Sequence, residues 1–92
     1  MWTVPPAKVA DFAPVYPPSA RASRISGTVV LESLISPSGC VRGLRSIQSP
    51  DSRLALASIV AVSRWRYEPS LLEGVPIAVT MTITVGFSLS VR

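Results

Sequence analysis

The chain has 92 residues, of which 48% are hydrophobic, and its formal net charge is +4. This length supports one domain with a modest core, and the apolar fraction excludes a disordered chain. No window approaches the 18 apolar residues of a membrane-spanning helix, and the first residues lack the basic and apolar regions of a signal peptide. If the protein works outside the cytoplasm, we expect its targeting segment to lie upstream of Met1.

The chemistry-bearing residues are few and scattered. Nine basic residues face five acidic ones, but the arginines are spread along the chain, whereas phosphate binding requires a concentrated patch. There is no histidine, no paired carboxylates and no glycine-rich phosphate loop, and the single Cys40 lacks a histidine partner. We therefore expect no enzyme, no metal, no cofactor and no nucleic-acid partner. Cys40 is interpreted as an incidental exposed thiol in a turn.

The N-terminal segment is rich in proline. Five prolines lie in residues 1–18, at positions 5, 6, 14, 17 and 18, and each favours extended backbone. We interpret 1–13 as the end of a proline-rich arm or linker and 14–92 as the domain. A short helix is predicted over 17–24, because proline is tolerated in a first helical turn.

A hairpin follows the short helix. Residues 27–35 predict a strand with Val29, Leu31 and Ile35 on one face and Ser33 as a polar defect on that face. Ser-Pro-Ser-Gly at 36–39 predicts a turn, and residues 41–48 predict the returning strand. Because the apolar residues of this second strand change parity, we expect a bulge near Gly43.

The second half of the chain predicts a longer helix. From Asp51 to Trp65 the small and apolar residues recur at helical spacing, with Ser49 or Asp51 as the N-cap. Tyr67-Glu68-Pro69 ends this helix, and Glu73-Gly74-Val75-Pro76 predicts a tight turn. Trp65 is interpreted as a core anchor, with Glu68 paired to a neighbouring arginine, in preference to direct ligand contact.

The C-terminal stretch from Val79 to Val91 predicts one strand with a buried face. Its odd positions are apolar: Val79, Met81, Ile83, Val85, Phe87, Leu89 and Val91. Its even positions are small and uncharged: Thr80, Thr82, Thr84, Gly86, Ser88 and Ser90. No charge or proline blunts it, as would be usual at a sheet edge. At about 40 Å it outruns the other strands, so part of its backbone is expected to stay unpaired within one chain.

These elements predict an α+β fold of two layers, with a three-stranded antiparallel sheet and two helices on one face. Four landmarks in the chain support a more specific assignment. They are Tyr16-Pro17 followed by Ala20, Ile25-x-Gly27-x-Val29 with Gly39-x-Val41, Arg64-Trp65-Arg66-Tyr67-Glu68-Pro69, and Gly74-Val75-Pro76 before the alternating strand to Phe87. In this order, over roughly residues 13–91, the chain resembles the C-terminal domain of TonB-family energy transducers.

The resemblance implies a periplasmic domain of a protein anchored in the inner membrane, where motor proteins act through an N-terminal segment absent here. It implies that the TonB box of an outer-membrane receptor pairs with the last strand. The partner-binding residues would then be Pro14, Val15, Tyr16, Val79, Thr80, Met81, Thr82, Ile83, Thr84, Val85, Gly86 and Phe87. Ser33 and Ser58 depart from the family's apolar or small residues, so the core is expected to be loose there.

Two alternatives stay open on the sequence. One is a periplasmic scaffold of the TolA type, which uses a similar small domain without energising receptors. The other is a self-associating interaction domain, because an unprotected strand edge can also join two identical chains in a homodimer.

Overall fold

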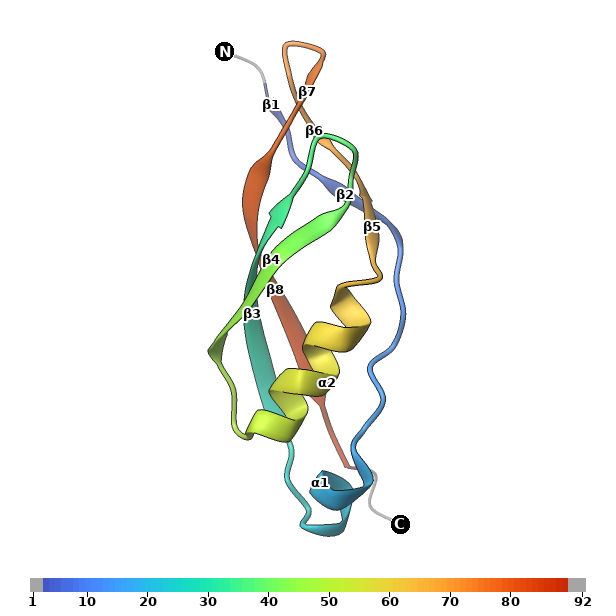
Figure 1. The fold of residues 1–92 in the computed structure, drawn as a ribbon, viewed down its shortest axis with the longest axis vertical. Helices are drawn as coiled ribbons and strands as arrows, with labels where there is room; N and C mark the ends of the chain where they lie inside the picture. The colour runs from blue at the N-terminus through green and yellow to red at the C-terminus, as the bar shows by residue number, and fades with distance from the viewer. Residues whose placement is uncertain (1–2, 90–92) are drawn as a thin grey trace.

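The computed structural model describes residues 3–89, and its centre is a three-stranded antiparallel sheet (Figure 1). The sheet consists of β3 (Gly27–Ile35), β4 (Val41–Gln48) and β8 (Val79–Phe87) in the order β4-β3-β8. The central strand β3 is buried on its odd positions, where Val29, Leu31 and Ile35 have no exposed surface. The predicted α+β fold class is confirmed.

Strand β8 is shorter than predicted. It pairs with β3 in unbroken register from Ile35↔Val79 to Gly27↔Phe87, and both strands have nine residues. The prediction that the strand outruns its neighbours is therefore wrong for Ser88 and Leu89, and its last positions, Ser90 and Val91, lie outside the described residues. The pairing stops at Gly27 because the chain turns there with a φ of 141°.

The hairpin of β3 and β4 carries the predicted irregularity. Glu32 pairs with Arg45 but Leu34 pairs with Arg42, so β4 has an extra residue between these pairs. Gly43 lies at this point with a φ of 58°, a conformation that favours glycine. The bulge allows Val41 and Leu44, which differ in parity, both to pack against the core.

Two helices flank the sheet. Helix α2 (Ser52–Val62) crosses one face, and the single turn of α1 (Pro18–Ala22) lies at one end (Figure 1). Asp51 is the N-cap of α2, since its side chain accepts a hydrogen bond from the Arg53 amide at 2.8 Å. The helix ends three residues before the predicted Trp65. In the part of the chain that the structure describes, neither helix has the length and apolar character to cross a bilayer.

The side of α2 that faces the sheet is buried as the spacing predicted. Its buried residues, with Trp65 after the helix end, are Leu54, Ser58, Ala61, Val62 and Trp65. The hydroxyl of Ser58 donates to Leu54 O at 2.8 Å, and that of Ser33 donates to Met81 O at 3.4 Å. Both buried serines thus have hydrogen-bond partners, and the looseness expected around them stays a prediction.

Five short strands were not predicted. Strands β1 (Thr3–Val4) and β2 (Ala7–Ala10) of the N-terminal arm pair with β6 (Ser70–Leu72) and β5 (Arg66–Glu68), respectively. Strand β6 also pairs with β7 (Val75–Ile77). The predicted tight turn is the connection of that hairpin, where Glu73 and Gly74 both have positive φ, as in a type I′ turn. The arm is extended as expected, and the domain boundary at residue 13 stays a prediction.

Strand β5 contacts the tip of the β3–β4 hairpin through Gly39. The amide of Tyr67 donates to Gly39 O at 2.9 Å. Gly39 has a φ of 86°, and a Cβ added there would lie 1.9 Å from Tyr67 O. Glycine is therefore required for both backbone conformation and space. The predicted ion pair of Glu68 with a neighbouring arginine is wrong, because no salt bridge of Glu68 occurs within residues 3–89.

We predict that Gly39→Ala lowers the free energy of unfolding by more than about 3 kcal/mol, since it combines a strained φ with a backbone clash. Gly74→Ala is the matched control, because Gly74 has a φ of 83° but no atom within 4 Å of the added Cβ. It should cost about 1–2 kcal/mol. Urea denaturation of both variants measures the difference, and equal costs would show that the contact with Tyr67 contributes nothing.

Candidate partner-binding edge

Strand β8 has one edge without a neighbouring strand among residues 3–89. Its other edge is fully paired with β3. The nine residues of β8 include no charge and no proline, which are the usual means of protecting a sheet edge. We call this side, from Val79 to Phe87, the open edge of β8, and it is the candidate site.

The backbone groups that face the open edge can be assigned from two hydrogen bonds. The amide of Ser36, just after β3, donates to Cys40 O on the β4 side at 2.9 Å. The Ser33 hydroxyl reaches Met81 O across the β3–β8 pair. Backbone direction alternates along a strand, so the odd residues of β8 bond β3. The residues that direct their N–H and C=O groups outwards are Thr80, Thr82, Thr84 and Gly86.

The side chains along the open edge also alternate. Ile83, Val85 and Phe87 are buried on the helix side of the sheet, with Val79 and Met81 half-buried. The even residues, three threonines and Gly86, are exposed on the opposite side. Along β8 itself, an added strand would therefore meet uncharged side chains on both faces, with the outward backbone groups between them.

The N-terminal arm lies opposite part of the open edge. A cavity of about 640 Å³ is lined by Val4, Pro5 and Pro6 of the arm and by residues 77 and 79–81. A second cavity, of about 320 Å³, is lined by Pro6, Lys8, Trp65, Tyr67 and residues 81–84. The arm and Trp65 thus form a wall beside the half of β8 that begins at Val79.

Three contacts hold this wall. The Trp65 indole Nε1 donates to Phe12 O at 2.9 Å. The Lys8 ammonium lies 4.3 Å from the centre of the Trp65 ring and 2.9 Å from the Asp11 carboxylate, which combines a cation–π contact with an ion pair. Burial raises the pKa of the Tyr67 phenol. Trp65 is buried, as predicted for a core anchor.

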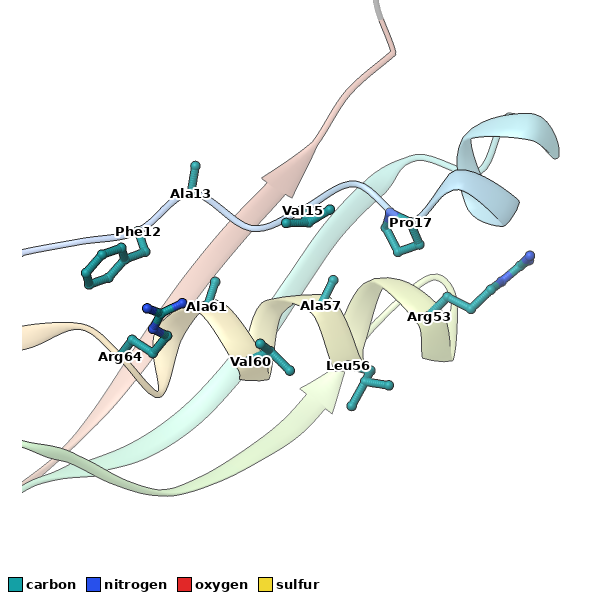
Figure 2. A pocket seen from close by; sticks show the side chains of 10 residues that line it. All are labelled: Phe12, Ala13, Val15, Pro17, Arg53, Leu56, Ala57, Val60, Ala61 and Arg64. Carbon is teal, nitrogen blue, oxygen red and sulfur yellow. The ribbon is translucent and has the colours of Figure 1, made fainter.

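The partner-binding residues predicted before α1, Pro14, Val15 and Tyr16, do not all lie beside β8. Tyr16 packs edge-on against Phe87 with ring centres 5.4 Å apart, and its hydroxyl donates to Ile25 O. It therefore packs against the last residue of β8, on the core side of the sheet. Val15 is 77% exposed and lines a cavity beside α2 (Figure 2). Pro14 precedes Val15 in the chain and is half-buried.

Sequence reasoning missed the arm as part of the site. Pro6 and Lys8 lie more than seventy positions before β8, and a four-residue strand gives no usable periodicity. Trp65 and Tyr67 belong to a motif that the sequence shows, but the sequence gives no indication that they lie beside β8. No residue type in the arm signals a strand, since its position follows from long-range pairing with β5.

The groups along the open edge of β8 are backbone amides and carbonyls with uncharged side chains beside them. Within residues 3–89 no group of three or more His, Cys, Asp or Glu residues could hold a metal ion. Cys40 lies at the hairpin tip, where a hydrogen bond with Ser38 lowers the pKa of its thiol. The arrangement of β8 instead suits the addition of an extended peptide by main-chain hydrogen bonds.

Comparison with known proteins agrees with this geometry. The family described as Gram-negative bacterial TonB protein C-terminal matches residues 13–89. Protein TonB of Vibrio cholerae serotype O1 is 33% identical over 81 residues, which are 87% of this chain and 33% of that protein. A solution NMR structure of the Pseudomonas aeruginosa TonB C-terminal domain superposes with a TM-score of 0.79 at 26% identity, covering 95% of this chain and 89% of that chain. The chain thus spans about a third of its curated relative, and it belongs to the TonB C-terminal domain family.

Proposed function

We propose that this chain is the periplasmic, receptor-binding domain of a TonB-like energy transducer. It docks the TonB box of an outer-membrane receptor by adding that segment as a strand to the open edge of β8, in support of active transport. The observation that carries the proposal is the unpaired, uncharged edge of a nine-residue strand in a chain of this family. The domain catalyses no reaction in this role.

The binding mode follows from the alternation along β8. An added strand hydrogen-bonds to the outward backbone groups at Thr80, Thr82, Thr84 and Gly86, which places few demands on its sequence. Its side chains alternate between the exposed threonine face and the cavity lined by Lys8, Trp65 and Tyr67. We therefore expect affinity to come from the main chain and receptor preference from the side chains that enter this cavity.

The pairing of β8 suits the transmission of force. A pull along the bound strand loads β8 parallel to its own axis. The nine β3–β8 residue pairs then share the load, so no single pair carries it alone. In the whole protein, an inner-membrane anchor and its motor proteins would supply this force through segments upstream of the arm.

Self-association is the alternative that a specific observation favours. The same unpaired edge can receive β8 of a second copy in an antiparallel, two-fold arrangement. A scaffold of the TolA type would use the fold without energising receptors. Sedimentation measured over a range of protein concentrations distinguishes a self-associating domain from a monomeric receptor-binding domain.

We predict that an extended peptide from a TonB-dependent receptor shifts the amide signals of residues 79–87 in an NMR titration of the ¹⁵N-labelled chain. The largest shifts should fall on Thr80, Thr82, Thr84 and Gly86, because their amides gain a bond. Binding should change little between 50 and 200 mM salt, since main-chain bonds release no counterions. Shifts confined to the arginines would contradict the proposal.

We predict that Thr84→Pro lowers the affinity for this peptide at least tenfold, because proline removes a donor from the open edge. Thr84→Val is the matched control, since it keeps the amide and the β-branched shape and should bind within about twofold of the unchanged chain. Calorimetric titration measures both affinities, and circular dichroism checks that both variants are folded. Unchanged affinity of a folded Thr84→Pro variant would move the binding site away from this edge.

A further inference from the structure

Helix α2 is apolar on the side that faces away from the sheet as well as on the side that faces it. Between Arg53 and Arg64 it has no charged residue. Leu56 is 64% exposed and Val60 is 57% exposed. A surface helix normally carries polar residues on its outer face, so this exposed apolar stripe needs a different explanation from core packing.

A cavity lies beside the stripe. It has a volume of about 400 Å³, within the range of binding pockets. Figure 2 shows its arrangement, with Ala57 and Ala61 between α2 and the arm, and with Phe12 and Val15 on the arm side. The small alanines leave room for large side chains. We call the cavity together with Leu56 and Val60 the α2 groove.

Charge at the two ends of the α2 groove is unequal. Arg53 and Arg64 both line the cavity. Arg53 lies in the first turn of α2 and Arg64 two residues after its last residue, so they mark opposite ends of the helix. Arg53 is neutralised by Asp51, whose carboxylate lies 2.9 Å away. Arg64 lies over the Phe12 ring, 4.8 Å from its centre, and it forms no ion pair within residues 3–89. No acidic residue lines the cavity, so one end carries an uncompensated positive charge.

We propose that the α2 groove binds an amphipathic α-helix of a partner protein, with an apolar stripe along α2 and a carboxylate opposite Arg64. Leu56, Val60 and Arg64 recur every four residues, which is the spacing that a second helix covers by ridges-into-grooves packing. Leu56 and Val60 point away from the arm in Figure 2. Both residues also line the cavity, so a small amphiphile within it would cover only the part of each side chain that faces the arm, whereas a helix laid along α2 covers their outer sides as well.

A second copy of this chain fits the groove less well than an acidic helix. Antiparallel packing of two α2 helices would bring Arg64 of one helix to the Arg53–Asp51 ion pair of the other. That pair has no net charge, so each Arg64 would still lack an acidic partner. The α2 groove is separate from the open edge of β8, because no residue of β8 lines the cavity.

Two synthetic 18-residue helical peptides test the proposal. Both have leucines on one face; beside the leucines, the acidic peptide has glutamates and the basic peptide has lysines. With the ¹⁵N-labelled 92-residue chain, the acidic peptide should shift the amides of Ala57, Val60, Ala61 and Arg64 in a saturable manner, and the basic peptide should not. The double variant Leu56→Gln/Val60→Gln should lower the affinity for the acidic peptide at least tenfold, and Arg64→Gln should lower it at least threefold. These positions are exposed, so the variants should fold.

Ile47→Gln is the matched control, because Ile47 is a 49% exposed apolar residue on β4 that does not line the cavity. It should leave binding unchanged. Equal binding of both peptides, or shifts confined to β8, would overturn the proposal. If the chain forms a dimer that the Leu56→Gln/Val60→Gln substitutions dissociate, the groove binds a second copy and the proposal is overturned. If sodium laurate shifts these amides more strongly than the acidic peptide does, the groove binds an amphiphile and the proposal is also overturned. Receptor-peptide binding at β8 should be the same in all these variants, which separates this result from the fate of the proposed function.

Discussion

The unbroken pairing of β8 with β3 is the constraint on which the rest of the structure depends. Nine residue pairs fix both strands in one register, and that register decides which side chains enter the core and which backbone groups face outwards. A shift of one residue would turn Ile83, Val85 and Phe87 to the solvent and expose the threonine positions to the core. Because the buried residues of β3 and β8 share one side, the hydrophobic core specifies the register strongly. The open edge is therefore presented in one fixed conformation, which reduces the ordering cost of adding a strand.

The arm owes its position to contacts that are distant in sequence. Gly39 lets β5 approach the hairpin, β5 pairs with β2, and Trp65 holds the carbonyl of Phe12. Each of these contacts joins the arm to the core through one or a few hydrogen bonds, whereas β3 and β8 share nine pairs. Opening of the arm therefore requires much less free energy than opening of the sheet. If a strand binds as proposed, we therefore expect the arm to adjust to it more readily than the β3–β8 pair.

Local patterns predicted the elements with clear periodicity, and long-range pairing decided the rest. The alternation from Val79 and the stripe ending at Trp65 placed β8 and α2, and the parity change around Gly43 predicted the bulge. The end of β8 was not predictable, because alternation continues past Phe87 in the sequence while the partner strand turns at Gly27. Short strands such as β1 and β5 were missed because two or three residues carry no period. In the candidate site, the two-sided character of β8 was predictable, but the approach of Lys8 and the separation of Val15 from Tyr16 depend on the path of the arm.

The two candidate surfaces differ in the kind of selectivity that their chemistry permits. Main-chain bonds at the open edge of β8 are available to almost any extended segment, so they cannot distinguish one partner from another except through flanking side chains. The α2 groove offers no free backbone and recognises a partner by apolar shape and by one unpaired arginine. A partner that engaged both surfaces would gain from their combined effective concentration. Because the two sets of contacts are chemically separate, substitutions in α2 should change which partners bind without changing how a strand is held on β8.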